Sequence, residues 1–304
     1  MTDRIKLGNA TVTRVLEWEF DVGTGLFAET PPDAWQDNAD LLVPTFYDPA
    51  TGRWRVVMQS WVIDVDGLTV VVDTGVGNDR ERPHIPALSG LSTDFLGALS
   101  RAGVDPAEVD VVVNTHLHTD HVGWNTKLVF GGGAPRPGDG PDGDWVPTFP
   151  NARYLVPEAD FRFFAPDGPG ASEGARIVMA DSVVPIVDQM ELWSVDLQIS
   201  ESLRLRPAAG HTPGSSVLWL EAGRPAVFVG DLTHCPIQIP RPGDPCGFDV
   251  DPAAAAVTRK RVFTEAARSR AMVIPAHYPG HGGATVVARG DRFEVDDWLE
   301  FAKV

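Results

Sequence analysis

This 304-residue sequence has few cysteines, few basic residues and no long apolar run. Its two cysteines, Cys235 and Cys246, allow at most one disulfide and form no C-x-x-C pair, so we expect two reduced thiols rather than a zinc or redox motif. Lys and Arg number 25 against 42 Asp and Glu. The resulting net charge of −17 argues against nucleic acid and anionic membrane surfaces as partners.

No apolar run approaches the roughly 20 residues that a membrane helix needs. Residues 1–15 (MTDRIKLGNATVTRV) contain no apolar core of signal-peptide length. We therefore expect a cytoplasmic protein. The sequence leaves the oligomeric state open, a homo-oligomer included.

The remaining composition, 43% hydrophobic and 22% charged residues, is that of a globular protein with a sizeable core. Apolar runs bounded by Gly, Pro and Asp alternate with helical patterns, which predicts an α/β layered fold in a single domain over residues 1–304. The expected strands are 54–64, 68–73, 109–114, 153–156, 203–206, 216–221, 226–230 and 271–275, and the expected helices are 92–102, 157–165, 172–190 and 252–269. Residues 131–144, rich in Gly, Pro and Asp, are expected to form an exposed loop.

Two similar segments suggest a duplicated architecture. VVVDTG at 70–75 and VFVGDL at 227–232 are both apolar strands that end in an Asp beside a Gly. This weak repeat predicts two β-rich halves, about 1–190 and 191–304, that face each other.

The strongest chemical signal is T-H-L-H-T-D-H at 115–121, directly after the apolar run VVVN. Imidazole nitrogens and carboxylate oxygens are usual zinc ligands. His116 and His118 point the same way in an extended segment, whereas Asp120 and His121 follow where the chain should turn. The motif therefore predicts ligands aimed at two neighbouring points.

H-x-H-x-D-H after an apolar strand resembles the metallo-β-lactamase fold superfamily. Further motifs match in the family's order across residues 54–281: Asp73 in VVDTG, His211 in AGHTPGS, Asp231 in VGDL and His277 in PAHYPGH. The resemblance implies a four-layer αββα sandwich with a dinuclear metal site.

The resemblance also implies a role for each of these residues. His116, His118 and His211 would hold one metal ion, Asp120, His121 and His277 a second, and Asp231 would bridge the two. Asp73 would orient a ligand through a hydrogen bond. The expected cofactors are two divalent ions, zinc first, with manganese, iron and cobalt as alternatives. A metal-bridging hydroxide would attack the substrate, and Asp120 would act as the catalytic proton acceptor.

The predicted ligand residues and the net charge argue against several branches of this superfamily. Classical zinc β-lactamases have Cys where Asp231 stands, and nucleic-acid-processing and glutathione-thioester branches fit a net charge of −17 poorly. The remaining resemblance is to acyl-homoserine lactonases and organophosphate hydrolases, which implies cleavage of a lactone or another small apolar ester. The alternatives are a phosphotriester hydrolase on the same site, a mono-iron sulfur dioxygenase-like oxygenase, and a non-catalytic metal-binding protein.

Aromatic residues are the candidates for an apolar substrate pocket, with packing in the core as the competing interpretation. Residues 18–35 are aromatic and turn-rich and could reach over the site. His234 is a further pocket candidate, while His84 and His281 are not expected to bind metal. The proposed pocket residues are Trp18, Phe20, Phe27, Trp35, Trp124, His234 and Tyr278.

Overall fold

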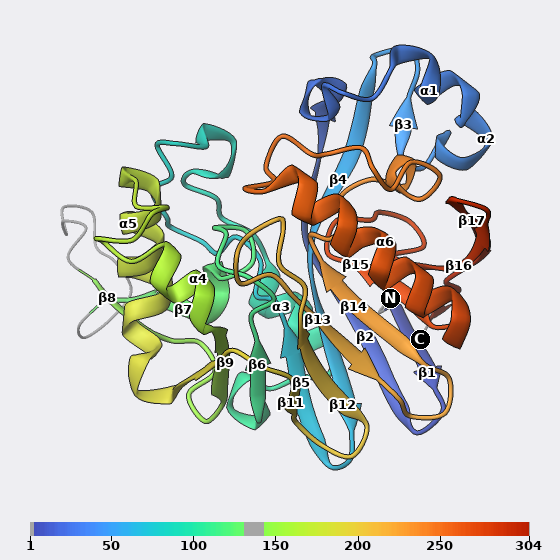
Figure 1. Ribbon diagram of the computed structural model, residues 1–304. Coiled ribbons are helices and arrows are strands. Elements are labelled where there is room, and N and C mark those ends of the chain that lie inside the picture. Colours follow the sequence, from blue (N-terminus) through green and yellow to red (C-terminus); the bar gives the residue numbers. More distant parts are fainter. Residues whose placement is uncertain (1–2, 131–142, 304) are drawn as a thin grey trace.

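The computed structural model describes residues 3–130 and 143–303, and two β-sheets face each other in it (Figure 1). The first sheet has the strand order β10-β9-β6-β5-β4-β2-β1-β18, with β3 paired to β4. Its strands are β1 (Asp3–Leu7), β2 (Ala10–Gly23), β3 (Tyr47–Asp48), β4 (Arg53–Val65), β5 (Leu68–Val72), β6 (Val111–Val113), β9 (Arg153–Pro157), β10 (Met190–Trp193) and β18 (Ala302–Lys303).

The second sheet runs in chain order from β11 to β17. Its strands are β11 (Leu197–Gln198), β12 (Leu203–Pro207), β13 (Ser216–Leu220), β14 (Ala226–Gly230), β15 (Met272–Pro275), β16 (Ala284–Arg289) and β17 (Arg292–Trp298). A separate hairpin pairs β7 (Thr126–Val129) with β8 (Asp144–Pro147).

The helices are mostly short. The α-helices are α1 (Pro32–Asp37), α2 (Ala39–Leu42), α3 (Phe95–Arg101), α4 (Glu158–Phe163), α5 (Glu173–Val178) and α6 (Pro252–Ser269). A π-helical turn (Met179–Val183) and a 3-10 helix (Val184–Gln189) continue α5, and further 3-10 turns lie at Thr24–Phe27, Pro86–Leu88, Pro106–Glu108, Gly123–Asn125 and Pro236–Gln238.

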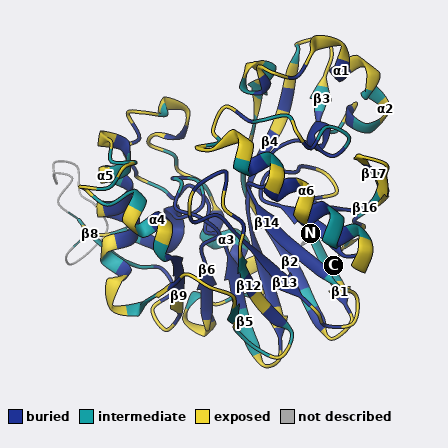
Figure 2. Cartoon of the chain, viewed as in Figure 1, coloured by how far each residue is buried: buried dark blue, intermediate teal, exposed yellow. Residues whose placement is uncertain are grey.

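Three apolar clusters stack the chain into four layers. In β5, Val70 and Val72 point into the cluster between the two sheets, and Val71 points to the opposite face, because side chains alternate along a strand. That opposite face packs against α3 and the α5 region through residues such as Phe95 and Val178. The outer face of the second sheet packs against α6. Figure 2 shows the strands of both sheets largely buried between exposed helix faces and loops. The predicted αββα sandwich is confirmed.

Local signals place several element ends. Asp251 caps α6 by accepting a hydrogen bond from the Ala254 amide, and Pro252 occupies the first turn, as the sequence predicts. The expected helix at 172–190 is instead α5 followed by the π-helical and 3-10 turns. Residues 131–142 of the expected loop lie outside the described residues.

The interpretation of residues 18–35 as a turn-rich segment is wrong for its first part. Residues 18–23 continue the long strand β2, which pairs with β4 up to Gly23 and has a register shift between Leu16 and Trp18. The shift accommodates Glu17, whose carboxylate turns inward to accept hydrogen bonds from the Val76 and Gly77 amides. The alternation of apolar and polar residues that marks a strand in a sequence is interrupted at such a bulge.

The strands up to Trp193 belong to the first sheet or to the separate hairpin, and those from Leu197 belong to the second sheet, except that β18 returns to pair with β1. Cys235 and Cys246 are both buried and unpaired, as expected. Across residues 3–130 and 143–303, no helix is long and apolar enough to cross a membrane.

Candidate metal centre and active-site cavity

The strand ends that meet in the middle of the molecule carry the predicted ligands. β5 and β6 are parallel neighbours in the first sheet, and Asp73 and the 115–121 loop follow their carboxyl ends. β14 and β15 are parallel neighbours in the second sheet, and Asp231 and His277 follow theirs. His211 lies in the turn between β12 and β13. The sandwich thus gathers ligands that are far apart in sequence.

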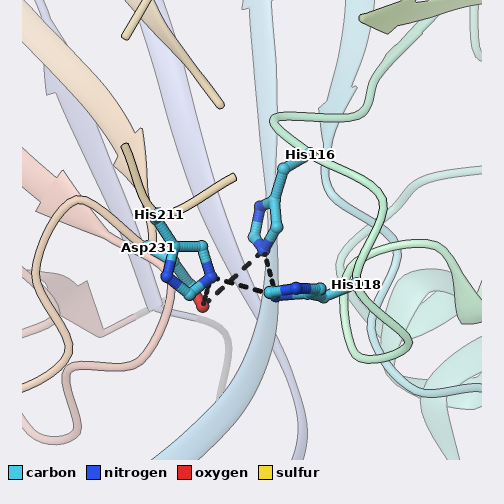
Figure 3. Close-up of side chains that lie close together, drawn as sticks. All are labelled: His116, His118, His211 and Asp231. Atoms are coloured by element: carbon cyan, nitrogen blue, oxygen red, sulfur yellow. Dashed lines mark hydrogen bonds and ion pairs between the residues drawn. The ribbon is translucent and has the colours of Figure 1, made fainter. Parts of the chain in front are cut away.

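One group of side chains converges as predicted: His116, His118, His211 and Asp231 (Figure 3). His118 Nδ1 lies 3.2 Å from His116 Nε2 and 3.0 Å from His211 Nε2. Asp231 Oδ2 lies 3.7 Å from His116 Nε2 and 3.3 Å from His211 Nε2. Bonds of zinc length arranged as a tetrahedron separate ligand atoms by about 3.4 Å. The observed spacing fits such a cation.

A second group consists of Asp120, His121 and His277. Asp120 Oδ2 lies 3.8 Å from His121 Nε2 and 3.5 Å from His277 Nε2. Asp231 turns its other oxygen, Oδ1, toward this group, at 3.2 Å from His121 Nε2 and 3.0 Å from His277 Nε2. One carboxylate therefore faces both groups, which is the arrangement of a bridging ligand.

The outer nitrogens of the histidines fix which atom faces the centre. His121 Nδ1 lies 2.8 Å from Asp73 Oδ2, His211 Nδ1 lies 3.0 Å from Asp249 Oδ1, and His277 Nδ1 lies 2.9 Å from the Val57 carbonyl. Because these oxygens only accept, each Nδ1 carries a proton, and each Nε2 is directed at Asp231, where a neutral ring presents a lone pair that can bind a metal ion. His121 Nε2 and Asp231 Oδ1 are buried without a hydrogen-bond partner among the described residues. Lone pairs facing a carboxylate require a cation between them, so the residues present fit divalent metal ions.

The pKa values of these histidines shift in different directions. Burial lowers the pKa of His116 well below its usual range and that of His118 to about 3, and it also lowers that of His211, so these rings are neutral and free to bind metal. Burial also lowers the pKa of His121, but Asp231, Asp73 and Asp120 outweigh it and raise that pKa well above its usual range. The same three carboxylates attract a metal ion.

Asp73 is held in an uncommon backbone conformation, with φ of +53°. Its carboxylate accepts hydrogen bonds from the Thr115 amide at 2.7 Å and the Thr115 hydroxyl at 2.8 Å, in addition to the contact with His121. A Cβ added at Gly230 would lie 2.5 Å from Thr115 Oγ1, which explains the Gly before Asp231. Asp73 thus joins both ends of the 115–121 loop.

Two further carboxylates support the ligands and were missed by the sequence analysis. Asp249 holds His211, as described above, and lies in an irregular segment that carries no motif. Asp160 in α4 accepts hydrogen bonds from the Leu117 amide, the Thr212 hydroxyl and the Gly214 amide, at 3.0, 2.8 and 2.6 Å. It therefore ties the His116–His118 loop to the His211 turn. Burial raises the pKa of Asp160 to about 6.

An apolar cavity of about 520 Å³ opens onto the second metal group. Asp120, Asp231, His118 and His277 form its polar end, and His234, predicted to lie in the pocket, lines it as well, with Nε2 3.2 Å from Asp231 Oδ2. The rest of the wall is largely apolar and comes from β2, β4, α5 with the π-helical turn, the 3-10 turn Thr24–Phe27, the 84–88 loop and the residues around Phe164 and Phe248. It includes Phe20, Val22, Leu26, Trp54, Val56, Met58, Ile85, Leu88, Phe164, Val178, Met179 and Phe248.

Most of the proposed aromatic walls are corrected by the structure. Phe20 lines the cavity, but Trp18, Phe27, Trp35, Trp124 and Tyr278 are not among its lining residues. Phe27 and Trp35 pack edge to face in the core. Trp124 stacks on Phe95 and donates its Nε1 hydrogen to Glu17. Tyr278 is buried, with its hydroxyl 2.8 Å from Thr233 Oγ1. Phe27, Trp35, Trp124 and Tyr278 are thus buried in the core, where their large apolar area is covered, whereas Trp18 is half-buried and stacks on Phe20.

The sequence matches the family described as Metallo-beta-lactamase superfamily over residues 55–277. The chain therefore belongs to the metallo-beta-lactamase superfamily.

Solved structures share the whole architecture. The hydrolase AbOPH, described as in the beta lactamase superfamily, has 20% identity and a TM-score of 0.78, with 100% of this chain and 98% of that chain covered. AidC, a dizinc quorum-quenching lactonase, has 18% identity and a TM-score of 0.75, with 100% and 98% covered. An N-acyl homoserine lactone hydrolase with N-hexanoyl-L-homoserine bound at its metal centre has 14% identity and a TM-score of 0.59, with 90% and 94% covered. At these identities the likeness shows the fold.

Proposed function

We propose that the protein hydrolyses a lactone or another small apolar ester, with two divalent metal ions, zinc in the first place, held by the two ligand groups. The observation that carries this proposal is the apolar cavity that ends at Asp120, Asp231 and His277. Neutral, apolar substrates suit such walls, and the net charge of −17 disfavours polyanions. Lactonases among the structural neighbours support the same choice.

His116, His118 and His211 would hold one ion, Asp120, His121 and His277 the other, and Asp231 would contact both. Such ions, when bound, supply a Lewis acid for the ester carbonyl and lower the pKa of water. Asp120 lines the cavity and directs Oδ2 toward His121 and His277. Its Oδ1 is the atom that takes the proton from the attacking water and returns it to the leaving oxygen.

The cavity walls orient the substrate. Phe20, Val56 and Met58 from the paired strands β2 and β4 line one side, and Val178 and Met179 contribute from the α5 region. An acyl or aryl group held between these side chains would leave its ester carbon at the polar end. The apolar walls would also exclude bulk water from that end. A cytoplasmic small molecule is the partner that we propose.

A substrate panel tests the proposal on protein purified without chelator. N-acyl homoserine lactones and aryl esters of rising chain length should be cleaved with rising kcat/KM, by up to about tenfold for two added methylenes. Metal analysis should give close to two ions per chain. A flat or falling trend would contradict the apolar-pocket argument.

Other outcomes identify the alternatives. A clear preference for phosphotriesters would make the protein an organophosphate hydrolase, since a neutral triester suits the same cavity. A reproducible single iron would favour the oxygenase. Full metal content without hydrolysis of any substrate would favour a non-catalytic metal-binding protein.

A further inference from the structure

Three segments around the cavity meet at one buried side chain, Arg82, whose exposed fraction is 0%. Its Nε donates a hydrogen bond to the hydroxyl of Thr119, which stands between the ligands His118 and Asp120. Its Nη1 and Nη2 donate to the two carboxylate oxygens of Asp181, at 2.7 and 3.0 Å. The guanidinium therefore ties the metal-ligand loop to the π-helical turn Met179–Val183.

Asp181 also pairs with a second buried arginine, Arg80, whose Nη1 lies 2.9 Å from Asp181 Oδ1. Arg80 Nη2 donates to the Thr126 carbonyl at 2.7 Å, just beyond the metal-ligand loop. Buried guanidinium groups are costly unless their planar donor sets are matched by acceptors, so these contacts fix the geometry rather than only the charge. The π-helical turn lies between α5 and the 3-10 helix Val184–Gln189, and π-helical turns frequently lie at functional sites.

The segments that Arg82 joins carry one side of the cavity. We call Ile85, Leu88, Val178 and Met179 the loop wall, because they come from the 84–88 loop, the end of α5 and the start of the π-helical turn rather than from a sheet. The two parts touch each other closely: a Cβ added at Gly174 would lie 2.5 Å from the His84 ring. The facing wall comes from β2 and β4, whose backbone pairing fixes it independently.

We propose that Arg82 is a specificity-determining positioning residue. It sets the distance between the loop wall and the metal-ligand loop, and so the preference for long acyl chains. Arg82 is not among the residues that line the cavity, so it acts through Thr119 and Asp181. This inference rests on the proposed esterase function.

Thr119 offers a matched pair of variants. Thr119→Val keeps the shape but removes the acceptor for Arg82, whereas Thr119→Ser keeps the acceptor. We expect Thr119→Val to lower kcat/KM for an aryl octanoate by about tenfold, the value of two methylenes, while that for the butanoate and the metal content change little. Thr119→Ser should retain the parental octanoate-to-butanoate ratio. Because valine makes the cavity more apolar, a direct effect of the new side chain would raise octanoate cleavage instead.

Met179→Ala supplies the wall control. It should lower octanoate cleavage by itself, and adding Thr119→Val to it should have little further effect, because both changes act on the same wall. Arg82→Lys, which keeps the charge but loses the planar fork, should reproduce the Thr119→Val pattern. Equal losses for octanoate and butanoate, additive losses in the double variant, or loss of metal from Thr119→Val would overturn the inference.

Calorimetric binding of octanoate and butanoate ions separates this inference from the proposed function. If no ester is hydrolysed, the proposed function is wrong. The ratio of the octanoate and butanoate affinities still measures how well the cavity wall accommodates a long acyl chain. A lower ratio in Thr119→Val than in the parent supports the role of Arg82. An unchanged ratio, or no preference for octanoate in the parent, contradicts it.

Discussion

Asp73→Asn should weaken one metal site and spare the other. The carboxylate accepts three hydrogen bonds, two from Thr115 and one from His121 Nδ1, through two oxygens. An amide has a single acceptor oxygen. If that oxygen faces His121, the amide nitrogen opposes the Thr115 N–H; if it faces the Thr115 amide, His121 loses its acceptor. Asn tolerates the φ of +53°, so the backbone should not change.

The size of the effect follows from the lost hydrogen bond. Hydrogen bonds to charged groups contribute about 1.5–3 kcal/mol, and loss of a partner behind a metal-binding histidine typically costs about 10–100-fold in metal affinity. These ranges agree, since each tenfold change corresponds to about 1.4 kcal/mol. We expect the loss at the group of Asp120, His121 and His277.

Asp249→Asn is the matched control, because Asp249 stands behind His211 in the other group. The assay measures metal retained per chain against rising concentrations of a competing chelator. The parent should release metal in two steps, Asp73→Asn should move one step, Asp249→Asn the other, and the double variant both. The reasoning is refuted if both single variants move the same step or if neither step moves by more than the error.

Three further predictions concern turnover, stability and the cavity. Asp120→Asn should lower turnover by about 100-fold or more at full metal load, with little change in melting temperature, because the amide cannot take a proton; turnover within a few-fold of the parent would exclude that role. Asp160 has a folded-state pKa of about 6, above its usual value, so its contribution to stability is present at low pH and lost as pH rises through 6. We therefore expect the free energy of unfolding of the parent to fall by about 1 kcal/mol relative to that of Asp160→Asn between about pH 5 and pH 7.5, as measured by urea unfolding of chelator-treated proteins. If the difference between the two free energies stays constant over this range, the raised pKa of Asp160 is contradicted. Met58→Ala, which enlarges the cavity, should reduce kcat/KM for long-chain esters more than for short ones. An equal reduction for both would show that Met58 does not contact the acyl chain.

Most strands and the whole predicted ligand set could be read from the sequence because their signals are local. An apolar run such as Val70–Val72 is buried on both faces, so composition alone marks it as a strand. H-x-H-x-D-H places four potential metal ligands within six residues. Few structural roles other than metal binding explain so many ionisable side chains in so short a segment. The capping of α6 by Asp251 is equally local.

The aromatic pocket residues could not be predicted in this way. Trp124 and Phe20 look alike in a sequence, yet one stacks on Phe95 and the other lines the cavity. Trp124 lies in the 3-10 turn Gly123–Asn125, whereas Phe20 lies on β2 beyond the bulge at Glu17, which shifts the register of that strand. A single inserted residue reverses the facing of every side chain beyond it.

The sequence by itself determined which atoms can bind metal, since ligand chemistry belongs to the residue types and their order along the chain. Only the tertiary structure decided what holds those atoms and what they face. Asp249, Asp160 and Arg82 lie 38, 43 and 37 residues from the partners that they position, His211, Leu117 and Thr119. Contacts over such separations arise from the packing of two sheets and their connecting loops, and no local pattern records them. The cavity beside the ligand groups exists only between those elements.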